Sequence, residues 1–275
     1  MVARHRRTPE LKTIMRYAAL GLIGLVITAP LIAFLVNAFA RQWFFPQLLP
    51  ETWTLEAWER LFSAGSDFTQ ALGNSTLIAT VVTVISLILG LPAARALGLY
   101  RFRGKRLLEF LLLLPAVVPP LAVSMGLTVN FLRWGLTGNW LGVALVHLVP
   151  VLPYVVLVLS GTFATYDISH EQQARTLGAK PLAVFLYITL PMILPGVVVA
   201  GLFAFLISWS QYLLTLLVGS GRVITLPILL FSSASGSNNT TIAVQALMFT
   251  APTLLLLIFT SRVLARNALT GLVRL

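Results

Sequence analysis

Residues 167–196 read DISHEQQARTLGAKPLAVFLYITLPMILPG, a polar stretch that runs directly into an apolar one. Ser169 is a candidate helix cap, and the residues after it are good helix formers: Glu171, Gln172, Gln173, Ala174 and Arg175. Gly178 is expected to end this helix, because glycine readily adopts the left-handed conformation found at helix ends. Pro181 suits the first turn of a second helix, and Pro191 is expected to bend the chain beyond it. The stretch therefore predicts a short polar helix, a sharp turn and a second helix.

Apolar sequence dominates on both sides of this stretch. Of the 275 residues, 58% are hydrophobic and 10% are charged, whereas soluble domains carry about 25% charged residues. A helix needs roughly 20 apolar residues to cross a bilayer. Six stretches meet or approach this length, at about residues 17–39, 75–97, 107–127, 141–163, 190–217 and 242–264. The sequence therefore predicts an all-α polytopic membrane protein, a single domain over residues 1–275 with six spans and a polar loop at about 165–189.

Three of these spans carry irregular features. Ser208 to Gln211 interrupt the fifth, and three prolines predict a kink in the third: Pro115, Pro119 and Pro120. The first span follows basic residues and ends in Ala38-Phe39-Ala40, which is also the appearance of a cleaved signal peptide. Its apolar core is longer than the roughly 7–15 residues usual in a signal, so an uncleaved first span is the preferred interpretation.

Lysine and arginine are distributed unevenly between the two sides of the predicted membrane. Fifteen of the 19 lie on the side that holds both termini and the 165–189 loop, with Arg4, Arg6 and Arg7 among them, and four lie on the other side. Because cytoplasmic loops carry the excess of Lys and Arg, the termini and this loop are expected in the cytoplasm. Attraction to anionic membrane lipid then accounts for the net charge of +11, and no nucleic-acid partner is expected.

Several kinds of active site are absent from the sequence. There is no cysteine, and no GxxxxGK[ST] phosphate-binding loop, HExxH or GxSxG motif occurs. The predicted spans also hold almost no ionisable residues, which ion-coupled carriers usually need to bind the coupling ion. If the protein moves a solute, the energy is therefore expected to come from another subunit. A stand-alone secondary carrier or channel and an intramembrane enzyme are the alternatives from other classes.

His147 is the exception, because it lies deep in the predicted fourth span. One interpretation is a proton relay or a substrate contact. No acid in the spans is available to partner it, so the preferred interpretation is a neutral imidazole bonded to a carbonyl or hydroxyl of a neighbouring helix.

The segment around Gly178 resembles the EAA loop of permease subunits of binding-protein-dependent ABC importers. That loop reads E-A-A, three residues, G, nine residues and I-x-L-P, and here Gln172-Gln173-Ala174, Gly178 and Ile188-Thr189-Leu190-Pro191 fall in register. Gln172 and Gln173 replace the usual Glu and Ala, and Glu171 is expected to supply the missing charge. The resemblance extends over about residues 49–264, including HLVPVLPYVV at 147–156 and SWSQYLLTLLVGSGRVITLPILLFS at 208–232.

This resemblance implies the type I permease fold and an importer of two permeases, two ATPase subunits and an extracytoplasmic solute-binding protein in a bacterial inner membrane. The ATPase subunits would use ATP and Mg²⁺, whereas this chain is expected to be non-catalytic and to bind no cofactor or metal. The loop helix is expected to dock on an ATPase subunit through these residues: Glu171, Gln172, Gln173, Ala174, Gly178 and Pro181. Whether the second six-span permease is identical or different stays open.

The substrate path is expected at the polar interruption of the fifth span: Ser208, Trp209, Ser210, Gln211 and Tyr212. Polar groups at membrane depth usually face a cavity or another helix, so ordinary interhelical hydrogen bonds are an equal alternative. Related polyamine permeases often carry acids near this point, whereas Ser210 and Gln211 are uncharged, which weakens a polycation as the substrate. Polyamine, thiamine, ferric iron, an oxyanion and a small sugar all stay open.

Overall fold

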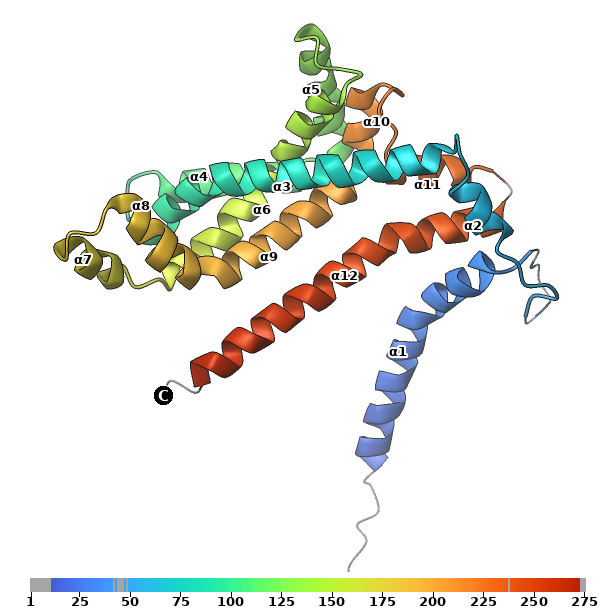
Figure 1. Cartoon of the computed structure of the whole chain (residues 1–275), viewed down its shortest axis with the longest axis horizontal. Helices are drawn as coiled ribbons and strands as arrows, with labels where there is room; N and C mark the ends of the chain where they lie inside the picture. Colours follow the sequence, from blue (N-terminus) through green and yellow to red (C-terminus); the bar gives the residue numbers. More distant parts are fainter. Residues whose placement is uncertain (1–10, 42, 44–46, 48, 237, 273–275) are drawn as a thin grey trace, which may run out of the picture. The chain divides into compact units, whose positions relative to one another are not determined.

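The computed structural model describes residues 11–41, 43, 47, 49–236 and 238–272, and this part of the chain is helical, with no strand among these residues (Figure 1). The helices are α1 (Leu11–Ala38), α2 (Glu56–Leu61), α3 (Asp67–Leu99), α4 (Lys105–Val117), α5 (Pro120–Arg133), α6 (Trp140–Ala164), α7 (Ser169–Thr176), α8 (Pro181–Val184), the π-helical segment η1 (Phe185–Thr189), α9 (Leu190–Trp209), α10 (Leu213–Gly219), α11 (Leu226–Ala234) and α12 (Asn239–Leu272). The predicted all-α fold is confirmed. The basic residues Arg4, Arg6 and Arg7 lie outside the described residues.

Five helical segments in the described part of the chain are long and apolar enough to cross a membrane: Met15–Ala38, Asp67–Leu99, Trp140–Ala164, Pro181–Trp209 and Asn239–Arg262. The number is six if the helices Lys105–Pro115 and Pro120–Arg133, which meet at 93°, are counted together as one broken span. The break falls at Val118, which is extended, and at Pro119, whose φ of −52° and ψ of 127° are also not helical. A residue before proline avoids the helical conformation, so the pair Pro119-Pro120 accounts for the break where the prolines predict a kink.

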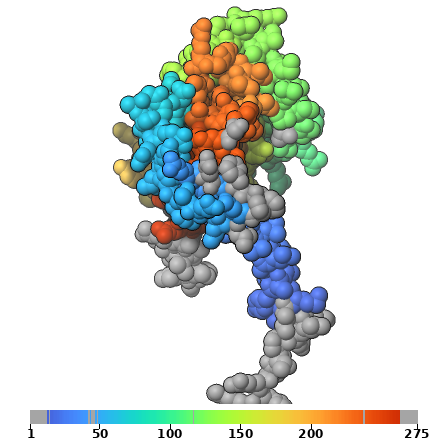
Figure 2. Space-filling model, turned by 90° about the vertical axis from the view of Figure 1, so that its right-hand side faces the viewer, coloured from blue at the N-terminus to red at the C-terminus, as the bar shows by residue number. Residues whose placement is uncertain are grey.

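The chain divides into two compact units, and the larger holds residues 64–232 and 249–275. Its core forms where α3, α6 and α9 pack against one another. A side chain at Gly90 of α3 would place its Cβ 2.7 Å from Val155 of α6, so the absence of a side chain there permits the close approach of these helices. α5 and α10 also pack together in this unit, in green and orange in Figure 2.

The smaller unit holds residues 1–63 and 233–248. In it, Trp58 of α2 packs on Phe39, with ring centroids 5.6 Å apart, and its indole N–H donates to the carbonyl of Ala38 at 3.0 Å. The hydroxyl of Thr240, near the start of α12, donates to the carbonyl of Ala40 at 3.2 Å. These contacts fix the chain where α1 ends.

The predicted fifth span differs from the structure at its beginning. The helix that starts at Pro181 does not end before the span, because the helical segment runs without a break from Pro181 to Trp209 through η1. In the π-helical segment η1 the backbone hydrogen bonds span five residues instead of the four of an α-helix. The N–H of Leu190, for example, bonds to the carbonyl of Phe185. Proline lacks an N–H and crowds the preceding turn of an α-helix, and a π-helical turn in that position accommodates both effects.

The end of the fifth span follows the predicted interruption at residues 208–211. The stretch 190–217 is not one helix, because α9 stops at Trp209 and α10 begins at Leu213. The hydroxyl of Ser210 donates to the carbonyl of Leu206 at 2.9 Å, where it competes with the backbone N–H of the same residue. Serine side chains disturb helices in this way. The polar residues that interrupt the apolar stretch therefore break the helix itself.

Candidate functional site

α7 is a short helix held between Asp167 and Gly178. Ser169 is the first residue of the helix rather than its cap. The side chain that accepts a backbone N–H at this end is Asp167, whose carboxylate accepts the N–H of Ser169 at 2.9 Å. A carboxylate suits this positive end of a helix, and the bonds from Ser169 lower the pKa of Asp167. At the other end Gly178 has a φ of 86°, and the N–H of Ala179 bonds to the carbonyl of Ala174 at 3.0 Å. Gly178 thus ends the helix as predicted.

Most of the predicted coupling residues lie on the outer surface of α7 and its turn. Gln172, Gln173, Gly178 and Pro181 are exposed, and Ala174 is half-buried. Beside them lies a hollow of about 550 Å³ between α7 and the segment η1–α9, lined in part by Leu177, Tyr187 and Met192. Leu177 is 87% exposed. An exposed apolar surface with a polar rim is typical of a surface that binds another protein.

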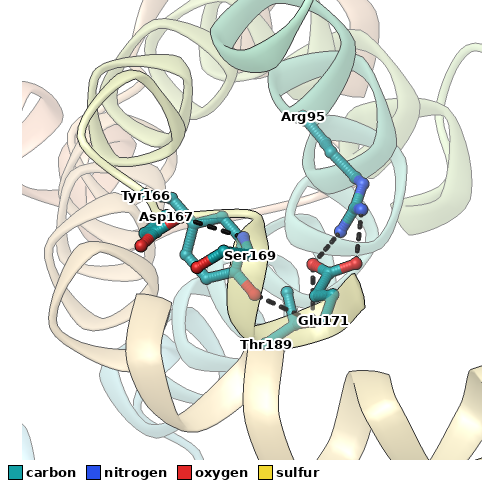
Figure 3. Close-up of polar contacts among 6 residues, drawn as sticks. All are labelled: Arg95, Tyr166, Asp167, Ser169, Glu171 and Thr189. Carbon is teal, nitrogen blue, oxygen red and sulfur yellow. Dashed lines mark hydrogen bonds and ion pairs between the residues drawn. The ribbon is translucent and has the colours of Figure 1, made fainter. Parts of the chain in front are cut away.

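Glu171 points the other way, into the chain's own helices (Figure 3). Its side chain is 4% exposed, and its two oxygens accept hydrogen bonds from the two terminal nitrogens of Arg95, at 2.8 and 2.7 Å. Arg95 lies near the end of α3. The carboxylate is therefore used within the chain, which departs from the prediction that Glu171 offers a charge at the docking surface.

Two further side chains complete this cluster. The hydroxyl of Thr189 in η1 donates to Glu171 at 2.9 Å, and the hydroxyl of Tyr166 donates to Thr189 at 3.4 Å. The hydrogen bond from Arg95 is the main cause that holds the pKa of Glu171 at about 2, against the opposing effect of burial. Burial raises the pKa of Tyr166. We call these four residues the α7 anchor: Arg95, Tyr166, Glu171 and Thr189.

The sequence provides only part of the α7 anchor. It assigns Arg95 to the basic residues of the cytoplasmic side, and it does not single out Thr189 beyond its place in the EAA-like pattern. The sequence does contain one indication of the α7 anchor, because Arg95 lies inside the apolar stretch 75–97. A charged side chain in such a stretch is usually paired with a residue of opposite charge. The carboxylate that meets this charge is 76 residues further along the chain, and only the packing of α7 brings it there.

A second candidate site lies where two spans are broken. A hollow of about 320 Å³ is lined by residues of α4 and α5 on either side of their break, by residues of α6, and by the break between α9 and α10 with the start of α10. Its polar lining consists of Ser124, Ser210, Gln211 and Tyr212, and the other lining residues are apolar. The described residues hold no group of three His, Cys, Asp or Glu that could bind a metal ion. The hollow can therefore offer hydrogen bonds but no ion pair.

The five predicted path residues fall into two groups. Ser210, Gln211 and Tyr212 line the hollow, whereas Ser208 and Trp209 are buried against other helices. The ring of Trp209 stacks on Phe205 and Phe249, and its N–H donates to the carbonyl of Phe249 at 3.0 Å. Ser208 and Trp209 therefore agree with the alternative interpretation, in which these side chains make ordinary hydrogen bonds between helices.

His147 connects α6 to both sides of the break between α9 and α10. Its Nδ1 lies 3.0 Å from the hydroxyl of Ser208, and its Nε2 lies 2.9 Å from the hydroxyl of Thr215. Thr215 donates its own proton to the carbonyl of Gln211 at 2.9 Å, so Nε2 of His147 must carry the hydrogen and Nδ1 must accept one from Ser208. A neutral imidazole between two hydroxyls matches the preferred interpretation of this residue.

The chain is similar to permease proteins of several transport systems. It is 32% identical over 225 residues to the trehalose transport system permease protein SugB of Mycobacterium tuberculosis, covering 80% of this chain and 82% of that protein. It is 33% identical over 202 residues to the molybdenum transport system permease protein ModB of Mycobacterium bovis, covering 68% and 76%. With the putrescine transport system permease protein PotI of Escherichia coli it shares 35% identity over 170 residues, 59% of this chain and 60% of that protein.

A solved structure and a family model agree with these relatives. The structure is that of a bacterial ABC transporter involved in the import of the acidic polysaccharide alginate, matched with a TM-score of 0.72 and 20% identity over 95% of this chain and 99% of that chain. The family described as binding-protein-dependent transport system inner membrane component matches residues 86–268, which include the α7 anchor and both broken spans. The chain therefore belongs to the family of inner membrane components of binding-protein-dependent transport systems.

Proposed function

We propose that this permease subunit of an ABC importer is driven by two separate ATPase subunits that dock on α7. The observation that carries the proposal is the two-sided geometry of α7: Gln172, Gln173 and Leu177 are exposed, while Glu171 is bonded to α3 behind them. A helix that is exposed in front and fixed behind moves as one piece with the elements to which it is bonded. ATP and Mg²⁺ belong to the ATPase subunits, and this chain is a non-catalytic subunit without a cofactor.

The transport cycle then follows from two states of the spans. Closure of the ATPase subunits on ATP displaces α7 and favours the outward-facing state, and hydrolysis returns the inward-facing state. The ATPases shift the equilibrium only as far as their contacts with α7 differ between the two states.

The hollow at the two broken spans is this chain's part of the solute path. Broken backbone at membrane depth is tolerated where it lines a cavity or is buried in protein. Here Ser210, Gln211 and Tyr212 lie at such a break and face the hollow. A second permease would close its other side. The uncharged lining weighs against a polyamine and leaves recognition to hydrogen bonds.

The placement in the cell follows the distribution of basic residues. The chain is a multi-pass protein of a bacterial inner membrane, with both termini and α7 on the cytoplasmic side, where Lys and Arg are in excess. An extracytoplasmic binding protein delivers the solute to the opposite side.

The experiment that tests this function measures ATP hydrolysis in nanodiscs. The chain is reconstituted alone, with its ATPase subunits and second permease, and with these and the binding protein. We expect hydrolysis only when the ATPase subunits are present, and stimulation by the solute-loaded binding protein. The solute is chosen by thermal shift of the binding protein with spermidine, thiamine, ferric iron, molybdate and trehalose.

One outcome contradicts the proposal directly. If the chain alone exchanges one of these solutes across vesicles without nucleotide, it is a stand-alone carrier or channel, and the ATPase subunits are not its source of energy.

A further inference from the structure

The bond between Glu171 and Arg95 differs from the other ion pairs among the described residues. It has two short contacts, and its side chains are 4% and 25% exposed. Arg41–Glu56 and Lys105–Glu109 each approach only to 3.9 Å and are more exposed. Exposed pairs contribute little, whereas two parallel bonds between a guanidinium and a carboxylate fix orientation as well as distance.

The α7 anchor joins three segments that are far apart in the sequence. Arg95 belongs to α3, Glu171 to α7 and Thr189 to η1, and Glu171 accepts from both of the others. η1 continues into α9, and α9 ends at the break that lines the hollow with Ser210. Bonded and helical structure is therefore continuous from α7 to the candidate solute path.

We propose that Arg95 and Glu171 are positioning residues that carry the displacement of α7 into α3 and, through Thr189, into α9. Neither residue touches the solute or the ATPase in this assignment. The inference rests on the proposed function, because it requires that ATPase subunits displace α7. It adds which bond transmits the movement: without the pair, α7 still docks but moves apart from the spans.

The pair has a clear physical requirement for both partners. Removing the charge of Glu171 leaves the guanidinium of Arg95 partly buried without its partner, and removing Arg95 leaves a buried carboxylate. α7 is then held to the bundle by its chain connections and by its packing against α8 and η1.

The test uses the full importer in nanodiscs and the absence of cysteine from this chain. Nitroxide labels are attached to Thr176→Cys on α7 and Leu89→Cys on α3, both exposed positions outside the docking and path residues. The distance between the labels is measured without nucleotide and after trapping with ATP and vanadate. With the pair intact we expect one narrow distance in both states, because α7 and α3 move together.

Glu171→Gln is expected to change this result. On trapping, the distance should shift or broaden, and the stimulation of ATP hydrolysis by the binding protein should fall at least about fivefold, the lower end of typical allosteric coupling. Glu109→Gln is the matched control, since it removes the carboxylate of an exposed pair and should change neither readout. An unchanged narrow distance and full stimulation in Glu171→Gln would overturn the proposal.

A double-mutant cycle separates the pair from general damage. In the double variant Arg95→Glu with Glu171→Arg, the binding protein should stimulate ATP hydrolysis more than in either single variant. Stimulation in the double variant that is no higher than in the weaker single variant would overturn the proposal. Arg95→Lys keeps the charge but not the two parallel bonds. Its stimulation of ATP hydrolysis by the binding protein should therefore lie between that of wild type and that of Glu171→Gln, and this variant provides a test even if Glu171→Gln folds poorly. Co-purification of the ATPase subunits tests the proposed function separately: if they do not bind the wild-type chain, that function fails first.

Discussion

Glu171 shows how one side chain can determine what its helix does. A charged residue in a short polar helix would be expected on the solvent side, yet its carboxylate is buried and bonded to Arg95 and Thr189. The exposed residues next to it, Gln172 and Gln173, are uncharged. At this scale α7 has an inner side held by a buried carboxylate and an outer side that exposes Gln172, Gln173 and the basic Arg175.

The first prediction concerns the pH dependence of this bond. The pKa of Glu171 is about 2 in the folded chain, below its ordinary value of 4.5, so its contribution to stability is complete above the ordinary pKa and is lost as the pH falls toward 2. The distance between labels at Thr176→Cys and Leu89→Cys should therefore be as narrow at about pH 5.5 as at about pH 8. Broadening between these two values would show that Glu171 does not stay ionised in its bond to Arg95.

The second prediction concerns His147. His147→Ala removes the partner of the hydroxyls of Ser208 and Thr215, both buried, and should lower the free energy of unfolding by about 1–3 kcal/mol. His147→Gln, which has both a donor and an acceptor, should lose less. Thermal unfolding in detergent measures both variants. If His147→Gln is fully stable but the importer loses transport, His147 acts as a proton relay or substrate contact instead.

At the scale of the element, the turn after α7 controls its direction. Gly178 has a φ of 86°, where residues with a side chain are strained, although no atom lies within 4 Å of the position a Cβ would take. The space is open, so any penalty comes from the backbone, on the order of 1–2 kcal/mol.

The third prediction follows from this turn. Gly178→Val should leave the chain in the membrane but sharply reduce the stimulation of ATP hydrolysis by the binding protein. Gly178→Asn is the matched control and should keep most of it, because asparagine tolerates the left-handed conformation better than branched residues do. Equal stimulation in the two variants would show that the conformation of this turn is not what couples α7.

The fourth prediction concerns the break between α9 and α10. Gln211 lines the hollow with its side chain and holds Thr215 with its backbone carbonyl. Gln211→Ala should therefore leave thermal stability and assembly unchanged while it changes the KM for the solute. A change in stability with unaltered uptake kinetics would place Gln211 among the structural residues.

Some elements were predictable from the sequence and others were not, for physical reasons. The polar helix, its glycine end and the kink at Pro119 follow from local chemistry, because capping and proline effects act within a few residues. The π-helical turn before Pro191 and the partner of Arg95 depend on packing between distant segments, which no local pattern encodes. The interruption at Ser210 was visible in the sequence, but the hollow that Ser210, Gln211 and Tyr212 line depends on residues of α4, α5 and α6 that are distant in the sequence.

For the whole molecule, the proposed function requires that the energy for transport come from other subunits. The sequence has no phosphate-binding loop, and the two candidate sites are a docking surface around α7 and an uncharged hollow at broken spans. The relatives named for trehalose, molybdenum and putrescine transport differ in the solute of their names. If the relatives share the ATPase-docking surface but differ in the residues that line the solute path, their similarity to this chain identifies its family but not its solute.

The most direct measurement is photo-cross-linking from benzoylphenylalanine placed at Gln173, on the exposed side of α7, in cells that express the full importer. Gln70, an exposed glutamine of α3 on the opposite predicted side of the membrane, is the matched control. The account predicts a cross-link to an ATPase subunit from Gln173 and none from Gln70. A cross-link to the ATPase from Gln70 alone, or from neither position, would contradict it.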